Sequence, residues 1–234
     1  MTQVLSPTPE ALALASQLLH DGQLVAFPTE TVYGLGANAL DAKAVLNIFA
    51  AKGRPADNPL IVHVYDRAQL TPLCEVSPLA ENLMDAFWPG PLTMVLPKAD
   101  IIPDIVTSGL PTVAVRVSAH PAMRGVAKAL GHPVAAPSAN RFGHISPTSA
   151  VQKELDGRIE MILDAGACSE GLESTIVRPM LDEKGKPALE LLREGPVTRE
   201  QFRNLVKVVR RKPSARPVSE EAPAEAPGQL SSHY

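Results

Sequence analysis

Three short polar clusters hold the residues whose types and spacing suit ligand chemistry. The first, residues 28–36 (PTETVYGLG), follows an apolar run and combines two threonine hydroxyls with two glycines. A proline stop followed by glycines predicts a tight loop with exposed backbone amides, which suits a small polar ligand. An ordinary turn fits these residues equally well.

The second cluster, residues 52–59 (KGRPADNP), places two cations two residues apart. Lys52 and Arg54 can converge on a polyphosphate, the arginine as a planar fork and the lysine as a compact charge. A structural alternative exists for Lys52, because the helix dipole favours a cation in the last turn of a helix. Arg54 lacks that alternative, since Gly53 and Pro55 hold it in a loop.

The third cluster, residues 137–140 (PSAN), follows the strand-like run 133–136 (PVAA). Small residues at the end of a strand let a planar ligand approach the backbone. Ser138 and Asn140 then offer donors and acceptors at the carboxyl end of the strand, where ligands of α/β folds bind. No one of the three clusters is specific by itself.

Two further polar residues interrupt apolar strands. In 113–117 (VAVRV) the valines point one way, and Ala114 and Arg116 point the other. A lone arginine on a half-buried face is normally paired, and a substrate carboxylate is one candidate partner. His63 interrupts the run 60–64 (LIVHV), although a lone strand histidine is more often a satisfied core residue.

Other catalytic signatures are missing from the chain. It contains no GxxxxGK[ST], HExxH or GxSxG motif. Residues 34–39 (GLGANA) fit the loose pattern GxGxx[GA], but Pro28 ends the preceding strand too early for a nicotinamide site. Cys74 and Cys168 lack metal-ligand spacing and indicate free thiols in a reducing compartment.

The elements that must position these clusters are interleaved helices and strands. Capping residues predict helix starts at Thr8-Pro9, Asp41, Ser77-Pro78, His120-Pro121, Ser146-Pro147-Thr148 and Thr198 with Gln201. β-rich runs lie at 24–27, 60–64, 92–96, 113–117, 134–136, 161–163, 175–177 and 189–192. Alternating polarity in several runs predicts an α/β protein with a mixed sheet, one face of which opens to a cavity.

Composition bounds the domain and its surroundings. The chain has 234 residues, of which 45% are hydrophobic and 20% charged, and we expect one domain over residues 5–205. A net charge of -3 argues against binding of a polyanion, such as a nucleic acid, over a wide face of the protein. We see no signal peptide and no apolar run long enough to span a bilayer, so the expected location is the cytoplasm.

The last residues differ in composition. Five cations lie between residues 207 and 216, and residues 217–234 are mostly Pro, Ala, Glu and Ser. Such a segment buries too little apolar surface to offset its ordering entropy, so we expect 206–234 to be a disordered tail. A weak contact between its basic stretch and an RNA backbone is the alternative.

Together, and in this order, the clusters closely resemble the Sua5/YrdC/TsaC family of threonylcarbamoyl-AMP synthases. The resemblance runs through PTETVYGLG at 28–36, KGRP at 52–55, WPGPLT at 88–93, AVRV at 114–117, SAN at 138–140, ESTIV at 173–177 and LREG at 192–195. It covers nearly the whole expected domain. The KxR and SxN motifs that mark an active synthase are intact, which disfavours the YciO branch, where they are altered.

The resemblance implies a fold and a set of site residues. The fold is a YrdC-like α+β arrangement: a twisted, mixed and largely antiparallel sheet with a concave face, flanked by helices. The implied threonine-binding residues are Thr31, His63, Arg116, Ala136 and Ser174. The implied ATP-binding residues are Lys52, Arg54, Asn58, Thr112, Ser138, Asn140, Ser146 and Arg193, with Lys52 and Arg54 also catalytic.

The resemblance also implies a reaction. L-threonine, bicarbonate or CO2, and ATP give threonylcarbamoyl-AMP and pyrophosphate, with Mg²⁺ accompanying ATP and no protein metal ligands assigned. The product passes to a tRNA threonylcarbamoyl transferase complex for modification of adenosine-37 in tRNAs that read ANN codons. The alternatives are a double-stranded-RNA-binding module and a carbamoyl-transfer domain similar to that of HypF.

One departure from the family is visible in the length after LREG. Longer Sua5 members carry a second domain there, whereas 39 residues, 196–234, follow in this chain. We therefore expect the single-domain type with an extension.

Overall fold

Helices begin where the capping residues predict them. The computed structural model describes residues 1–53, 55–140 and 155–209. At the first helix, the Thr8 side chain accepts a hydrogen bond from the backbone N of Ala11. The expected starts give α1 (Pro9–His20), α2 (Ala42–Lys52), α3 (Pro78–Phe87), α5 (Pro121–Leu130) and α7 (Arg199–Arg203). The start expected near Ser146 lies outside the described residues. The short α4 (Asp104–Thr107) and the 3-10 helix η1 (Arg67–Leu70) were not expected.

The strands form one mixed sheet. They are β1 (Gln3–Leu5), β2 (Val25–Phe27), β3 (Gly34–Asn38), β4 (Ile61–His63), β5 (Leu92–Pro97), β6 (Thr112–Arg116), β7 (Val134–Ala135), β8 (Met161–Leu163), β9 (Thr175–Leu181), β10 (Pro187–Arg193) and β11 (Lys207–Val209). Their order is β1-β8-β2-β3-β7-β4-β6-β5-β9-β10-β11. The predicted mixed sheet is confirmed, and five of these ten neighbouring pairs are antiparallel.

The strand β3 begins inside the loop expected at 28–36 and takes its last three residues, 34–36. Gly36 pairs with Val25 of β2, and Ala37 pairs with Ala135 of β7. A Cβ on Gly36 would lie 2.3 Å from Cε1 of Phe27, so this glycine lets an aromatic ring pack against the strand. The GxGxx[GA] pattern is therefore extended backbone in the sheet, with no phosphate loop.

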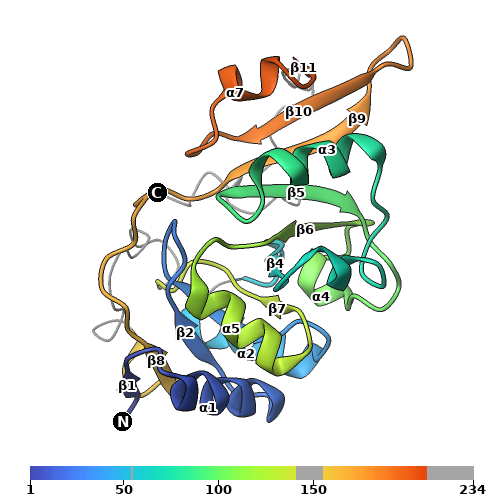
Figure 1. Ribbon diagram of the computed structural model, residues 1–234. Helices are drawn as coiled ribbons and strands as arrows, with labels where there is room; N and C mark the ends of the chain where they lie inside the picture. Colours follow the sequence, from blue (N-terminus) through green and yellow to red (C-terminus); the bar gives the residue numbers. More distant parts are fainter. Residues whose placement is uncertain (54, 141–154, 210–234) are drawn as a thin grey trace.

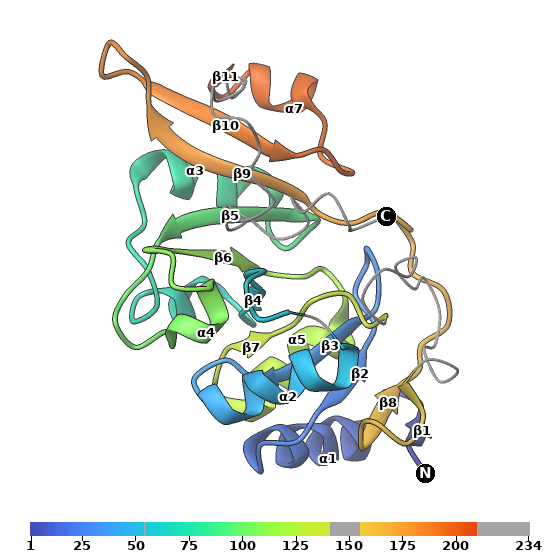
Figure 2. The same ribbon diagram turned by 180° about the vertical axis from the view of Figure 1, so that it is seen from behind.

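Helices cover the two faces of the sheet unequally. α1 and α5 pack against Val25, Phe27 and Val134 on one face, whereas α2, α3 and α4 contribute to the larger core on the other. α5 lies in front of the sheet in Figure 1, and α2 lies in front in the reversed view of Figure 2. On the α1/α5 face, the described residues of β4, β6, β5 and β9 form a small apolar cluster, Ile61, Val95, Ala114 and Ile176. This part of the face is where a ligand can approach the strands.

The described chain begins and ends at opposite edges of the sheet. β1 pairs in parallel with β8, and β11 pairs in parallel with β10. Both strands reach beyond the expected domain bounds of 5 and 205, so the expected tail begins with residues that join the sheet. Residues 210–234 lie outside the described residues, and the expectation for them stays a prediction. No helix among the described residues is long and apolar enough to cross a membrane.

Candidate active site

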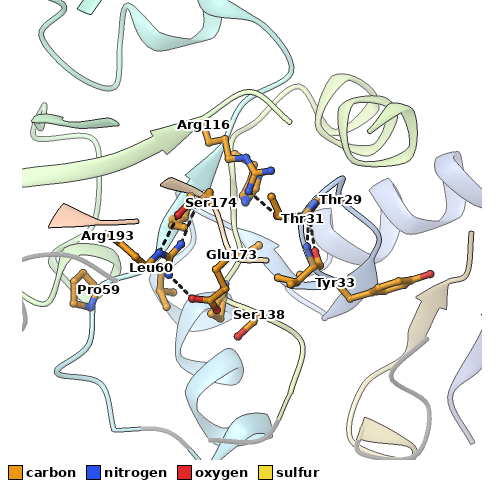
Figure 3. Close-up of a pocket in the computed structure, with 16 residues that line it drawn as sticks. Thr29, Thr31, Tyr33, Pro59, Leu60, Arg116, Ser138, Glu173, Ser174 and Arg193 are labelled. Carbon is orange, nitrogen blue, oxygen red and sulfur yellow. Dashed lines mark hydrogen bonds and ion pairs between the residues drawn. The ribbon is translucent and has the colours of Figure 1, made fainter. Parts of the chain in front are cut away.

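A pocket opens on the α1/α5 face of the sheet, beside β4 and β6 (Figure 3). Its lining comes from the 29–34 segment, β4 and the two residues before it, the end of β6, the 136–138 segment, the two residues before β9 and the last residue of β10. The lining residues are Thr29, Thr31, Val32, Tyr33, Gly34, Pro59, Leu60, Ile61, His63, Arg116, Ala136, Pro137, Ser138, Glu173, Ser174 and Arg193. Segments far apart in sequence thus converge on one cavity.

All five residues expected to bind threonine line this pocket: Thr31, His63, Arg116, Ala136 and Ser174. Strand register explains part of this convergence, because His63 of β4 pairs directly with Arg116 of β6. The backbone N of Ala136 donates to Ile61 O at 2.8 Å, which brings the third strand alongside. Two of the expected nucleotide residues, Ser138 and Arg193, line the same pocket.

Arg116 is the buried cation of the pocket, with 3% of its surface exposed. Its Nε donates to Gly90 O at 3.2 Å and its Nη1 donates to Thr31 Oγ1 at 3.0 Å. Its Nη2 forms an ion pair with Glu30 Oε1 at 2.7 Å. A guanidinium carries five N–H donors, so these contacts leave donors on both terminal nitrogens for a further anion.

His63 is a buried, neutral imidazole. Burial lowers its pKa to about 3, helped by the Arg116 charge and opposed by Glu30. Its Nδ1 has no hydrogen-bond partner among the described residues. The imidazole therefore brings a polar atom to the pocket without bringing a charge.

Ser174 and Arg193 belong to one hydrogen-bonded group. Arg193 donates from Nε to Ser174 O at 2.9 Å and from Nη2 to Ser174 Oγ at 3.0 Å, and its Nη1 pairs with Glu173. Ser174 Oγ also lies 2.8 Å from Thr93 Oγ1. Figure 3 shows Arg193, Ser174 and Glu173 together on the side of the pocket opposite Thr29 and Thr31. This group joins β5, β9 and β10 at the cavity.

The 29–34 segment is held by its own hydroxyls. Thr29 Oγ1 accepts from the backbone N of Thr31 and of Val32, at 3.1 and 3.2 Å. The hydroxyl of Tyr33 donates to Asp164 Oδ1 or Gly166 O, at 3.1 and 2.8 Å, and its ring points away from the other labelled residues in Figure 3. These bonds fix the loop that carries Thr31 to Arg116.

Lys52 takes the position that the structural alternative gave it, the last turn of a helix. It is the last residue of α2, only 3% exposed, and its ammonium donates to the carbonyl oxygens of Ser138 and Asn140. Gly53 then ends the helix in the left-handed conformation, with φ of 61°. In this structure Lys52 therefore holds the SxN segment in place beside the pocket.

The remaining expected nucleotide residues take varied positions. Asn58 is fully buried next to Pro59, and Asn140 is buried beside Lys52. Thr112 begins β6 on the strand face of Ala114 and Arg116, but it does not line the pocket. Arg54 and Ser146 lie outside the described residues.

Sequence reasoning assigned no role to Glu30 or Glu173. Burial would raise the pKa of Glu30, but Arg116 and the Ser118 hydroxyl lower it to about 2, so it is a carboxylate. Both acids stood inside motifs already noted, PTETVYGLG and ESTIV. The sequence held two signals for the ion pair between Glu30 and Arg116: an acidic residue between two threonines, and a lone arginine in an apolar strand.

No group of three or more His, Cys, Asp or Glu side chains suited to a metal ion occurs among the described residues.

Comparison with known proteins identifies the family. A family model described as "Telomere recombination" (Sua5_yciO_yrdC) matches residues 17–195, which include every described residue of the pocket. The chain belongs to the Sua5/YciO/YrdC family.

Curated relatives of this family member are named as synthases. Threonylcarbamoyl-AMP synthase of Pyrococcus abyssi is 46% identical over 226 residues, which cover 95% of the chain and 65% of the relative. The Bacillus subtilis protein of the same name is 47% identical over 210 residues, with 88% and 59% covered. The chain thus spans less than two thirds of the length of these two relatives.

Solved structures of family proteins share the fold. The crystal structure of P. abyssi Sua5 complexed with L-threonine superposes with a TM-score of 0.86 at 42% identity, covering 97% of the chain and 67% of that protein. E. coli YciO superposes with a TM-score of 0.75 at 21% identity and full-length HypF with 0.64 at 19%, and these two show the fold alone.

Proposed function

We propose that this family member is an L-threonylcarbamoyladenylate synthase, and that the pocket under Arg116 binds L-threonine. The observation that carries the proposal is the convergence of Thr31, His63, Arg116, Ala136 and Ser174 on one pocket. Support comes from the 42% identity with P. abyssi Sua5, whose crystal structure contains L-threonine.

In the proposed complex, Arg116 binds the threonine carboxylate through its remaining N–H donors. The hydroxyls of Thr31 and Ser174 and the neutral imidazole of His63 then surround the rest of the amino acid. A neutral His63 favours an uncharged threonine amine nearby, because it adds no positive charge and can form a hydrogen bond. An uncharged amine is the form that reacts with a carbon electrophile.

The proposed chemistry has two steps. The amine nitrogen bonds to the carbon of CO2 and releases a proton, or it bonds to the carbon of bicarbonate with loss of water; either route gives a carbamate. A carbamate oxygen then attacks the α-phosphorus of ATP, the bond to the β-phosphate oxygen breaks, and pyrophosphate leaves. Carbamates revert easily in water, so enclosure and alignment of the reactants are the main tasks of the site.

The nucleotide is proposed to lie on the Ser138 and Arg193 side of the pocket. Lys52 and Asn140 shape that side, and Arg54, Asn58, Thr112 and Ser146 stay proposed contacts on the strength of the family motifs. A Mg²⁺ ion bound with ATP would neutralise phosphate charge. Since the described residues offer no carboxylate cluster, we expect the phosphates to hold that ion.

We further propose that the product serves tRNA modification at adenosine-37 through a transferase complex in the cytoplasm. The free thiols Cys74 and Cys168 suit a reducing compartment. The names of the synthase relatives support the proposed synthesis of threonylcarbamoyl-AMP. The tRNA and the transferase complex are proposed partners.

The experiment that tests the function is product formation from labelled bicarbonate. The purified protein is incubated with ATP, Mg²⁺, L-threonine and ¹⁴C-bicarbonate, and the acid-labile adenylate and pyrophosphate are quantified. We expect equal amounts of both products and none when L-threonine is omitted. Pyrophosphate release that is independent of L-threonine would contradict the proposal.

A further inference from the structure

Glu30 lies directly behind the arginine that faces the pocket. Both oxygens of its carboxylate are used: Oε1 pairs with Arg116 Nη2 at 2.7 Å, and Oε2 accepts a hydrogen bond from Ser118. Only 7% of Glu30 is exposed, and it does not line the pocket. It therefore contacts the arginine without being placed to contact a ligand.

The backbone of Glu30 is held as firmly as its side chain. Its carbonyl oxygen accepts from the backbone N of Glu170 at 2.8 Å and from Ser169 Oγ at 3.3 Å. Residues 169 and 170 belong to the connection between β8 and β9, which leads to Glu173 and Ser174 at the pocket. Glu30 thus joins two segments that line the cavity.

The Arg116 guanidinium has two hydrogen-bond acceptors, Gly90 O at Nε and Thr31 Oγ1 at Nη1, and one ion-pair partner, Glu30, at Nη2. They differ in strength, because only Glu30 is charged and charge-assisted contacts are the stronger ones. Arg116 cannot lose its proton, so its charge must stay compensated while it is buried. Glu30 is the acceptor that can both compensate the charge and fix the plane.

We propose that Glu30 is a positioning residue, which holds the Arg116 guanidinium in the orientation that receives the carboxylate of the amino-acid substrate. This inference rests on the proposed function, since it takes L-threonine as the ligand. Glu30 acts through Arg116 and does not touch the substrate.

Electrostatic repulsion between Glu30 and the substrate would have the opposite effect on binding. A second carboxylate near Arg116 also repels the carboxylate of the substrate, so removing its charge could strengthen binding. Glu30 pairs with Arg116 at 2.7 Å from outside the pocket lining, whereas the substrate carboxylate would bind from within the pocket. The Glu30–Arg116 contact exists with and without substrate, so it acts on affinity through the orientation of the guanidinium. Because Coulomb repulsion falls with distance and Glu30 lies outside the pocket lining, we expect the loss of orientation to outweigh the relief of repulsion.

The test is calorimetric titration of L-threonine and of L-threoninamide, which lacks the carboxylate, into the full chain and the Glu30→Gln variant. We expect the variant to bind L-threonine at least about tenfold more weakly, the scale of one charge-assisted hydrogen bond. Binding of L-threoninamide should change less than about twofold, since that ligand does not depend on the fork. A purely structural role would weaken both ligands equally.

The matched control is Glu190→Gln. Glu190 is also largely buried and pairs with Arg178 at 3.2 Å across β9 and β10, away from the pocket lining. This variant should bind L-threonine as the unaltered protein does. If Glu30→Gln fails to fold, Ser118→Ala removes the hydrogen bond to Glu30 Oε2 together with the one that Ser118 Oγ accepts from the backbone N of His120, and we expect a smaller loss of L-threonine affinity in the same direction.

Four results would overturn the inference. Tighter L-threonine binding in Glu30→Gln would show that repulsion by Glu30 is the larger effect. Unchanged binding would show that Arg116 keeps its orientation without Glu30. Equal weakening of both ligands would show a structural role. If the unaltered protein binds no L-threonine, both the proposed threonine site and this inference fall, whereas binding without adenylate formation contradicts only the proposed function.

Discussion

At the scale of single residues, the five residues proposed to bind threonine offer one charged contact, Arg116, and several neutral polar ones. Arg116 is common to any amino-acid substrate, because every amino acid has a carboxylate. Thr31, His63 and Ser174 are neutral and lie around the same cavity. Choice among amino acids must therefore depend on these neutral groups.

We predict the substrate order threonine, then serine, then valine. Loss of the methyl group in serine should cost about 1–3 kcal/mol of transition-state binding. Loss of the hydroxyl in valine leaves buried polar partners unpaired, and such sites reject the deoxy analogue by roughly 10⁴-fold. The measurement is kcat/KM for pyrophosphate release with each amino acid at saturating ATP and bicarbonate. Valine matching serine would show that the pocket senses shape and not the hydroxyl.

The buried histidine predicts a stability change with pH. The pKa of His63 falls from 6.5 to about 3 on folding, so above pH 6.5 neither state carries the proton. Below pH 6.5 the unfolded chain binds a proton that the folded chain does not, and stability is lost as the pH falls toward 3. At about pH 5 the loss from this residue is about 2 kcal/mol.

The measurement is urea unfolding of the unaltered protein and the His63→Gln variant at about pH 7.5 and about pH 5. The unaltered protein should lose about 2 kcal/mol more than the variant between these pH values. His120, whose pKa is also lowered by burial, titrates in both proteins and cancels in the difference. Equal losses would mean that His63 is protonated in the folded state.

At the scale of elements, the end of α2 and the strand β3 show where local sequence was sufficient and where it was not. Asp41 and Gly53 identify both ends of α2, since a cap and a left-handed glycine are local features. The burial of Lys52 was not predictable, because it depends on the carbonyls of Ser138 and Asn140, 86 and 88 residues away. The first residues of β3 were predicted as a loop because two of them are glycines. The strand is defined by its pairing with β2 and β7, which the local sequence does not reveal.

The Lys52 contacts predict a loss of stability as well as of activity. Lys52→Ala removes a donor from two buried carbonyl oxygens, which should lower the free energy of unfolding by about 1–3 kcal/mol. Synthase activity should fall by about 10²-fold or more, the scale of losing one preorganised charge. Denaturant unfolding and adenylate formation check the two effects. Full stability with lost activity would contradict a structural role for the Lys52 contacts.

The glycines of β3 predict a graded effect on packing. A Cβ on Gly36 would meet Phe27 Cε1 at 2.3 Å and Val134 Cγ1 at 2.9 Å, whereas one on Gly34 would meet Phe27 Cε2 at 3.0 Å. Gly36→Ala should destabilise the protein by about 1–3 kcal/mol, and Gly34→Ala by less. Melting temperatures of the two variants make the comparison. An equal or larger effect of Gly34→Ala would contradict this account of the strand.

At the scale of the whole molecule, the site exists because the sheet order brings distant motifs together. His63 and Arg116 meet through the parallel pair β4 and β6, and the β5–β9 pair brings Ser174 beside Thr93. The mixed α/β class and the convergence of Thr31, His63, Arg116, Ala136 and Ser174 were predicted from motifs and family resemblance. The strand order was not, because non-local pairing leaves little trace in the residues of each strand. The ion pair behind Arg116 escaped prediction for the same reason.

The most direct test of the threonine site is the dependence of adenylate formation on L-threonine concentration in the unaltered protein and in Arg116→Lys. Lysine keeps the charge but loses the planar fork. We predict that the KM for L-threonine rises by about 10²-fold in the variant, on the scale of lost bidentate recognition, while the KM for ATP changes less than about twofold. Arg116→Lys with an unchanged KM for L-threonine, or with equal losses for both substrates, would contradict the assignment of the pocket to L-threonine.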